Sequence, residues 1–371
     1  MDERIKVFVG LDVHKESIEI GVADAGRAEP RSLGRISHDV PKLLKALRRL
    51  GEPESIQVVY EAGPTGYGLQ RALTERGYVC EVIAPSLIPR RAGDRIKTDR
   101  RDCLNLARLS RSGELRAVHV PDAADEAIRD VVRAREDAVN ARTRARQHLR
   151  AFLLRHGVRY SAGKKAWTAM FYRWLSDLTF EAPASHLAFV EYRLAVEAAD
   201  QRLERLTQAL LGVVAGWRFE PVVAALRALR GVDSLVAIGL IAEIGDIARF
   251  DHPRKLMAYL GLVPSERSSG ERTQRGSITK AGNAHARRLL VEAAWSYRFR
   301  PSIGRRAQTR QQDLPVSIRE TAWKAQLRLS ERFAKLSARG VHKNKVCVAI
   351  ARELSSFVWA IAHDSQSASR H

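Results

Sequence analysis

Apolar and polar residues in the first hundred positions alternate in short runs that predict both strands and helices. IKVFVGLDVH is expected to form a strand ending in an acid, SIEIGVADA a second strand, and residues 31–36 a short third one. Asp39 is placed to cap a helix that runs to Leu50, IQVVYEA and YVCEVIA are further strands, and GPTGYGLQRALTERG lies between them as a helix. A meander of strands followed by alternating strands and helices predicts a ribonuclease-H-like α/β layer.

Helical spacing takes over from residue 122. Residues 122–157 contain few helix breakers and many arginines, which predicts one long and very basic helix. A second helix over 186–214 carries apolar side chains at the spacing of a coiled-coil seam, namely Leu203, Leu206, Leu210 and Val213. The two helices are expected to pack as an antiparallel arm or to pair between subunits, with an irregular connector over 161–181.

The last third of the chain combines helices with one polar segment. LRGVDSLVAIGLIAEIGD resembles a helix-hairpin-helix, in which Gly231 ends the first helix and residues 241–247 belong to the second. PSERSSGERTQRGSITKAGN is expected to be a loop, and the chain becomes helical again from Ala284, with breaks near Pro301 and at Gly340. These patterns predict three domains: an α/β domain over 1–118, a helical coiled-coil arm over 119–216, and a mainly α C-terminal domain over 217–371.

Charge changes the picture of the partner more than it changes the fold. The 371 residues carry 63 Lys and Arg against 42 Asp and Glu, a formal net charge of +21, which favours a polyanionic partner such as nucleic acid. No apolar run reaches the roughly 20 residues of a membrane span, and MDERIK has no signal-peptide character. We therefore expect no membrane partner and a cytosolic location. Cys80, Cys103 and Cys347 match no zinc or disulfide spacing and are expected to be small buried residues.

Four acids stand where a metal site could form. Asp12 and Glu61 each end an apolar strand, and Asp99 and Asp102 in KTDRRD share one face if that segment is helical. Each acid alone is as well explained as a cap, turn or surface residue. Together they predict a site for Mg²⁺ or Mn²⁺, which prefer oxygen ligands and assist phosphoryl transfer.

Five segments carry a family resemblance. VFVGLDVHKE, YEAGPTG, KTDRRD, PSERSSG and GSITKAGNAHARR resemble the transposases of the insertion-sequence-110 family, also called bridge-RNA-guided recombinases. The family's pattern of Asp, Glu, Asp and Asp in a RuvC-like domain falls on Asp12, Glu61, Asp99 and Asp102. The resemblance further implies a nucleophilic serine in the C-terminal domain that forms a covalent phosphoserine with DNA. Its position falls on Ser269, and the adjacent Ser268 leaves the register open by one residue.

The resemblance also implies partners. These are donor and target DNA, a structured guide (bridge) RNA that pairs with both, and further copies of the chain in a dimer or tetramer within the prokaryotic cytosol or nucleoid. Arginine binds phosphate with a planar fork and glycine lets the backbone approach it, so two basic groups are expected to bind nucleic acid. One lies in the long helix and the other in and after the polar segment: Arg142, Arg144, Arg146 and Arg150, and Arg272, Arg275, Lys280 and Arg287.

Three other functions remain open at this stage. A hydrolytic nuclease or junction resolvase would use the same four acids to activate water and would not need Ser269. An actin-like ATPase is suggested by GLDVHKESIEIGVAD, but the chain lacks a second glycine-rich phosphate loop and a duplicated domain. A non-catalytic nucleic-acid packaging protein would account for the charge, and the acids at strand ends argue against it.

Overall fold

The computed structural model describes residues 4–89, 98–161, 166–269 and 272–368. For Arg267 to Ser269, Arg272, Thr273 and Arg275 the description is limited to the backbone. The chain forms two compact units, Met1–Pro121 and Asp122–His371, and each is considered by itself below.

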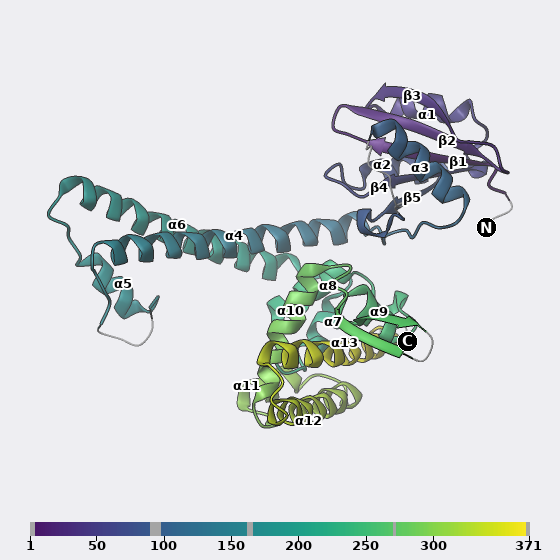
Figure 1. Cartoon of the computed structure of the whole chain (residues 1–371). Helices are drawn as coiled ribbons and strands as arrows, with labels where there is room; N and C mark the ends of the chain where they lie inside the picture. The colour runs from purple at the N-terminus through teal and green to yellow at the C-terminus, as the bar shows by residue number, and fades with distance from the viewer. Residues whose placement is uncertain (1–3, 90–97, 162–165, 270–271, 369–371) are drawn as a thin grey trace. The chain divides into compact units, whose positions relative to one another are not determined.

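The first unit contains a mixed five-stranded sheet of order β3-β2-β1-β4-β5 (Figure 1). β1 is antiparallel to β2 and parallel to β4, which places it at the centre of the sheet. The expected order of strands and helices is confirmed, and it is consistent with a ribonuclease-H-like layer. The elements are β1 (Val7–Val13), β2 (Ser17–Asp24), β3 (Arg31–Ser37), α1 (Val40–Arg48), β4 (Ile56–Glu61), α2 (Gly68–Thr74), β5 (Val79–Ile83) and α3 (Asp99–Arg111).

Helices cover both faces of this sheet. On one face, Leu43 and Leu47 of α1 and Leu73 of α2 pack against Val9 and Leu11 in the larger core of the unit. On the other face, α3 packs against the sheet through Ala107, beside Phe8, and through Leu106, beside Val59. Because side chains alternate along a strand, the second face also receives Asp12 of β1 and Glu61 of β4. The helix that carries the other two acids therefore lies on the same side of the sheet.

Two glycines allow α3 to approach the sheet closely. Gly10 of β1 and Gly21 of β2 are register partners. A Cβ atom added at Gly10 would lie 2.2 Å from the carbonyl oxygen of Cys103, and one added at Gly21 would lie 2.7 Å from the same oxygen. Larger side chains at these two positions would force the helix away from the strands, so the glycines determine how near Asp99 and Asp102 come to the sheet.

The second unit begins with the two long helices, α4 (Ala123–Arg155) and α6 (Pro183–Val213), which lie side by side (Figure 1). Both helices match the expected ranges closely. The buried side chains of α6 recur at every seventh residue, at Phe189, Val196, Leu203 and Leu210. Val213, expected in this seam, is 47% exposed, and Val214 is buried instead because the chain leaves the helix there.

The connector between these helices is more regular than expected. It contains α5 (Ala169–Ser176), whose first turn is capped by Thr168 through a hydrogen bond from the amide of Phe171. Phe171 and Leu175 are buried with Phe152 and Phe189 at the end of the arm. This helix has only eight residues, which is too short a window for helical periodicity to be recognised from sequence.

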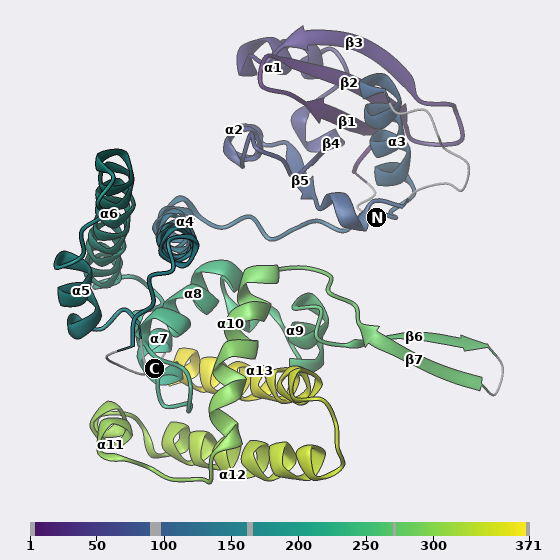
Figure 2. The same ribbon diagram turned by 60° about the vertical axis from the view of Figure 1, so that its left-hand side comes forward.

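Helices form most of the remaining chain and enclose the main core of the second unit (Figure 2). The helix with residues 241–247 ends earlier than expected, because Gly245 has a positive φ of 76° and leaves Ile247 in a separate 3-10 turn. The breaks near Pro301 and at Gly340 are confirmed. The helices are α7 (Glu220–Leu226), α8 (Ser234–Ile244), α9 (Pro253–Tyr259), α10 (Ala284–Ala294), α11 (Arg305–Gln311), α12 (Val316–Ala338) and α13 (Lys343–Ala368).

One stretch of α13, Lys343–Gln366, is long and apolar enough to cross a membrane by length and composition. Its apolar residues Val346, Ile350, Leu354 and Val358 are fully buried in the main core of the unit. This burial accounts for its composition as that of a core helix. This stretch is not an uninterrupted apolar run in the sequence, because Arg352 and Glu353 lie within it.

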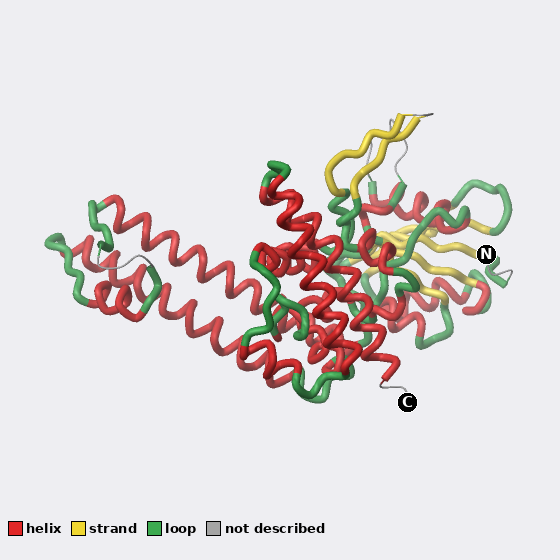
Figure 3. The backbone as a smooth tube through the Cα atoms, turned by 90° about the horizontal axis from the view of Figure 1, so that it is seen from below, coloured by secondary structure: helices red, strands yellow, loops and turns green. Residues whose placement is uncertain are grey.

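The segment expected to be a polar loop is instead a β-hairpin of β6 (Pro264–Ser269) and β7 (Arg272–Ile278). The hairpin extends away from the helices of its unit (Figure 2), and its strands are drawn in yellow in Figure 3. Sequence periodicity missed it because a hairpin without a covered face needs no alternation of apolar and polar residues. At its base, Gly282 has a φ of 66°, and a Cβ atom there would lie 1.9 Å from the carbonyl oxygen of Tyr259.

Candidate active site

Asp12 lies near the end of the central strand, where the side chains of β1 are no longer fully buried. Its side chain is 19% exposed, and its register partner on β2 is Glu19. Hydrogen bonding with β4 pairs Leu11 with Tyr60, so Asp12 and Glu61 are the next residues along two adjacent parallel strands. The local fold thus brings the ends of both acid-bearing strands to one edge of the sheet.

The start of α3 carries the second pair of acids. Thr98 caps this helix by accepting a hydrogen bond from the amide of Arg101 at 3.3 Å. Asp99 and Asp102 both lie in the first turn, where the positive end of the helix dipole stabilises carboxylates. The expectation that these two residues belong to a helix is confirmed.

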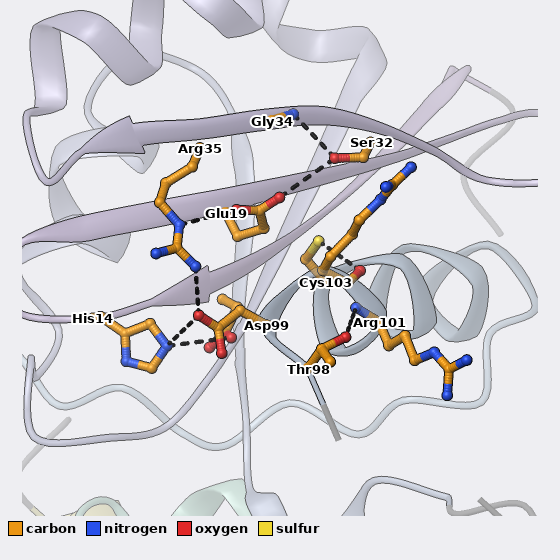
Figure 4. Close-up of polar contacts among 11 residues, drawn as sticks. His14, Glu19, Ser32, Gly34, Arg35, Thr98, Asp99, Arg101 and Cys103 are labelled. Carbon is orange, nitrogen blue, oxygen red and sulfur yellow. Dashed lines mark hydrogen bonds and ion pairs between the residues drawn. The ribbon is translucent and has the colours of Figure 1, made fainter. Parts of the chain in front are cut away.

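Two of these acids, Asp12 and Asp99, converge with the histidine His14. Figure 4 shows the ring of His14 beside the carboxylate of Asp99. One ligand atom each from Asp12, His14 and Asp99 lies within 4.8 Å of the other two. The Nε2 atom of His14 is 3.4 Å from a carboxylate oxygen of Asp12 and 3.6 Å from one of Asp99. His14 stands two residues after Asp12 in the sequence, and no sequence pattern indicated that it belongs to the site.

The electrostatics of Asp12 place Asp102 near the same point. Burial raises the pKa of Asp12, and although the neighbouring His14 lowers it, the carboxylates of Asp99 and Asp102 raise it further. The net shift is upward. Several carboxylates so close together repel one another when ionised, and a bound divalent cation would relieve this repulsion.

Of the four predicted acids, Glu61 has the fewest observed links to the other three. It ends β4 and is partly buried, and its carboxylate is not part of the group formed by Asp12, His14 and Asp99. Its backbone position beside Asp12 is the expected one. Asp12, Asp99 and Asp102 therefore lie near one another, and Glu61 is related to them by the strand register. That all four acids surround the same ions stays a prediction.

A fifth acid and an arginine complete the surroundings of the group. Glu19 is buried, and it accepts a hydrogen bond from Nε of Arg35 at 3.2 Å. The same guanidinium donates to Asp99 at 2.7 Å, so Arg35 joins β3 to the start of α3 (Figure 4). Sequence reasoning missed Glu19, although an acid within an apolar strand, opposite Asp12 in the hairpin, was the available signal.

The donor set fits a divalent metal ion. Carboxylate oxygens from Asp12 and Asp99, with Asp102 nearby, are the hard ligands that Mg²⁺ and Mn²⁺ prefer, and His14 offers a nitrogen that Mn²⁺ accepts more readily than Mg²⁺. Arg35 is the cation that faces Asp99 in this structure.

Ser269 is the last described residue of β6, where its backbone pairs with Arg272 across the hairpin. Ser268 pairs with Thr273 in the same ladder. The side chains of Ser268, Ser269, Arg272 and Arg275 lie outside the described part of the structure. Both serines belong to the end of β6 at which the strand approaches the tip of the hairpin.

The four arginines predicted along α4 differ in their surroundings. Arg146 donates to Asp200 at 2.8 Å and to the hydroxyl of Tyr172 at 3.1 Å, and its guanidinium lies 4.6 Å from the ring centre of Trp167. Arg142 approaches the same aspartate at 4.0 Å. Arg144 and Arg150 are exposed. Two of the four arginines thus hold the arm together, and the other two face the surroundings.

The predicted basic residues after the hairpin also separate. Arg287 is partly buried and donates to the carbonyl oxygens of Leu260 and Ala281, both at 2.9 Å, which ties the chain at the hairpin base to α10. Lys280 is exposed at a positive φ of 56°. Of these two residues, Arg287 is engaged within the protein, and Lys280 presents its charge at the surface.

A buried acid joins the hairpin base to the arm. Glu243 of α8 receives two hydrogen bonds from Arg133 of α4, at 3.0 and 3.2 Å, and one from Asn283 at 2.6 Å. Asn283 also caps α10, directly after the hairpin. Burial raises the pKa of Glu243, but the hydrogen bonds from His285, Arg133 and Asn283 outweigh it and hold the pKa well below its usual value.

Known protein families match both units of the chain. Residues 223–308 match the family model described as Transposase IS116/IS110/IS902 family. Residues 9–157 match a second model, DEDD_Tnp_IS110, described as a transposase. The second match includes Asp12, Glu61, Asp99 and Asp102, and the first includes Ser269.

Similar proteins cover nearly the whole chain. A putative transposase, y4qE, of Sinorhizobium fredii is 48% identical over 97% of this chain and 90% of its own length. The transposase for insertion sequence element IS1533 of Leptospira borgpetersenii is 34% identical over 89% of this chain and 96% of its own. A probable family 20 transposase of Pseudomonas aeruginosa is 28% identical over 64% of this chain and 70% of its own.

Proposed function

Since the chain belongs to the IS110 family of transposases, we propose that it moves an insertion sequence by cutting and rejoining DNA through a covalent phosphoserine. The observation that carries this proposal is the convergence of Asp12, Asp99 and His14, with Asp102 close by, at the edge of the sheet. A group of carboxylates in a protein of net charge +21 is a site where metal ions can meet a phosphodiester.

In this proposal Asp12, Asp99, Asp102 and Glu61 hold Mg²⁺ or Mn²⁺. When bound, these ions polarise the scissile phosphate and stabilise the charge on the attacking and leaving oxygens. Arg35, which donates to Asp99 at 2.7 Å, orients that carboxylate, and the backbone of α3 over Gly10 and Gly21 sets its distance from Asp12. These residues supply positioning, while the chemistry of strand transfer needs a nucleophile.

Ser269 is the proposed nucleophile. Its Oγ attacks phosphorus, so that an O–P bond forms, one ester bond to a deoxyribose oxygen breaks, and the serine proton leaves as the departing oxygen becomes a hydroxyl. A deoxyribose hydroxyl of another strand then attacks the phosphoserine, which restores a phosphodiester and releases Ser269. The phosphoserine is itself a phosphodiester and is not hydrolysed, so rejoining needs no nucleoside triphosphate. The position of Ser269 next to the tip of an extended hairpin supports this role.

The proposed partners are donor and target DNA, a guide RNA, and further copies of the chain. Exposed Arg144 and Arg150 on α4 support contact with a nucleic-acid backbone. Leu187 and Leu194 of α6, which are 64% and 44% exposed, stand one heptad apart on the arm. Such a stripe supports pairing of arms in a dimer or tetramer. The proposed location is the prokaryotic cytosol.

The test begins with protein purified together with its RNA, which is sequenced to define the DNA sites. Wild-type protein, Ser269→Ala and Ser268→Ala are then incubated with those sites and Mg²⁺, and protein-linked DNA is detected after denaturation. We expect an adduct with the wild type and Ser268→Ala and none with Ser269→Ala, and peptide mapping places it on Ser269. Strand cleavage by Ser269→Ala without any adduct in the wild type would instead identify a hydrolytic nuclease. An adduct lost only in Ser268→Ala would move the nucleophile by one residue.

A further inference from the structure

A groove of about 900 Å³ lies in the second unit, beside the base of the hairpin that carries Ser269. Residues of β6 and β7 form one side, including Pro264 and Ile278, while α9, α12 and α13 form the rest. These elements lie close together within the unit (Figure 2). None of the site residues predicted from sequence lies on the three helices that line the groove.

Basic side chains dominate the polar lining of this groove. Five cations from three helices face it together with one acid: Arg254 of α9, Arg328 and Arg332 of α12, Lys345 and Arg352 of α13, and Glu353. Arg254 and Lys345 are exposed. Within the described ranges, the side chains of Arg254, Lys345 and Arg352 have no ion-pair partner. The groove therefore presents positive charge that the described part of the protein does not neutralise.

Glu353 holds two of the other cations in place. Its carboxylate is 18% exposed and pairs with Arg328 at 2.9 Å and with Arg332 at 2.5 Å. Arg328 and Arg332 stand one helical turn apart on α12 and are 65% and 48% exposed, so their guanidinium groups remain accessible. Surface pairs of this kind contribute little to stability, and here the pairing fixes where the two charges stand.

The spacing of the cations fits a nucleic-acid strand. Lys345 and Arg352 are seven residues apart on one helix, which at 1.5 Å per residue is about 10 Å, the rise of roughly three nucleotides along one strand of DNA. The apolar part of the lining includes Met257, Ile278 and Val348. Lys and Arg side chains bind the phosphates of any sequence, so the contacts that these cations offer are contacts with the backbone.

We propose that this groove binds the phosphodiester backbone of the DNA on which the hairpin acts. The inference rests on the proposed function for its choice of DNA, because the hairpin that carries Ser269 and the groove share Pro264, Gly276, Ser277 and Ile278. A DNA backbone held at the hairpin base would limit the positions that the strand can take relative to the hairpin tip. Sequence choice would then come from elsewhere, since phosphate contacts position a protein without reading sequence.

The test measures equilibrium binding of the full-length protein, freed of RNA, to a random-sequence DNA duplex and to an RNA duplex of the same sequence at several salt concentrations. The groove variant carries Arg254→Gln, Lys345→Gln and Arg352→Gln. The matched control carries Arg305→Gln, Arg306→Gln and Arg319→Gln, which removes the same charge from exposed positions of α11 and α12 outside the groove. Thermal unfolding of all variants verifies that they are folded.

We expect the groove variant to bind DNA about tenfold or more weakly than the wild type, with a salt slope lower by about 0.9 for each phosphate that is no longer neutralised, and the control to change little. A further variant, Glu353→Gln, removes the acid from the groove and is expected to bind DNA several-fold more tightly, an effect that damage to the fold would not produce. Equal losses in the groove and control variants, or a loss confined to RNA, would overturn the proposal. The binding measurement needs no cleavage, so its outcome is independent of whether Ser269 forms an adduct.

Discussion

Gly10 of the central strand stands directly opposite Gly21 of its antiparallel neighbour, and the backbone of α3 at Cys103 passes over both. Because the first turn of the same helix carries Asp99 and Asp102, this close approach determines how near two of the acids come to Asp12. Two glycines thus determine the spacing of the acids in the proposed metal site.

The first prediction concerns this approach of helix and sheet. We expect Gly10→Ala to cost about 1–3 kcal/mol of unfolding free energy, because its methyl group would displace α3, and to weaken Mg²⁺ or Mn²⁺ binding more than stability alone explains. Calorimetric titration of metal and thermal unfolding measure the two effects. Gly68→Ala, at a helical position with open space around it, is the control and should change neither. Normal metal affinity in Gly10→Ala would show that α3 can shift without disturbing the acids.

The second prediction concerns the charge at the site. The folded-state pKa of Asp12 is raised by burial, and by Asp99 and Asp102 against the effect of His14. The protonated form of Asp12 therefore contributes to the free energy of unfolding at low pH. This contribution is lost as the pH rises from about 4, the pKa of an unfolded aspartate, through the raised pKa of the folded state. We expect Asp12→Asn to unfold at a higher temperature than the wild type at pH 7 without metal, and to lose at least about a hundredfold in strand cleavage.

Metal should reduce or reverse this difference in unfolding temperature between Asp12→Asn and the wild type. Added Mg²⁺ is expected to raise the unfolding temperature of the wild type more than that of Asp12→Asn, because it relieves repulsion that the variant lacks. Glu29→Gln, which removes an exposed acid from the same unit, serves as the control and should respond like the wild type. An equal response of wild type and Asp12→Asn to metal would place the ion elsewhere.

The third prediction separates the arginines of α4. Arg146→Ala removes a partner of Asp200 and Tyr172 and should cost about 1–2 kcal/mol of unfolding free energy. Arg144→Ala removes an exposed side chain and should change stability by less than about 0.5 kcal/mol while weakening RNA binding. Chemical denaturation and RNA titration of both variants distinguish the two roles. A stability loss in Arg144→Ala equal to that in Arg146→Ala would contradict the assignment.

The fourth prediction concerns the buried acid at the hairpin base. Glu243 has a folded-state pKa below its unfolded value, so the stability it contributes is full above about pH 4.3 and is lost as the pH falls toward the folded-state pKa. We expect Glu243→Gln to flatten the loss of stability below that pH. Arg133→Ala should cost about 2 kcal/mol at pH 7, because the carboxylate stays buried with two hydrogen bonds fewer.

The readout for this prediction is urea denaturation of each variant between about pH 3 and pH 7. Glu292→Gln is a suitable control, since its carboxylate is exposed and pairs with Arg288 on the same helix, α10. If Glu243→Gln and Glu292→Gln show the same pH dependence as the wild type, Glu243 does not contribute to acid unfolding.

Much of the architecture follows from local sequence patterns. The order of strands and helices in the first unit, the two arm helices and the breaks in the C-terminal region were predicted, because each depends on periodicity and capping within some ten to thirty neighbouring residues. The β6–β7 hairpin and α5 were missed. The hairpin has too few apolar positions to show the alternation of a strand, and α5 is too short for a helical period to emerge.

The candidate site divides in the same way. Asp12, Asp99 and Asp102 were recognisable as acids at a strand end and on one helix face, and the resemblance to transposases implied a nucleophilic serine at Ser269 or the adjacent Ser268. The places of His14, Glu19 and Arg35 beside the acids could not be predicted from sequence. Their contacts form only where β1, β2, β3 and α3 come together in the fold.

The sequence alone therefore decided which acids exist, which elements carry them and which family the chain resembles, all of which depend on residue identity and short-range periodicity. Tertiary packing decided how far α3 lies from the sheet and that the carboxylate of Glu61 stays outside the group formed by Asp12, His14 and Asp99. It also decided that Arg146 binds Asp200 within the arm. These outcomes depend on steric and electrostatic contacts between elements far apart in the chain, and no local pattern encodes such contacts.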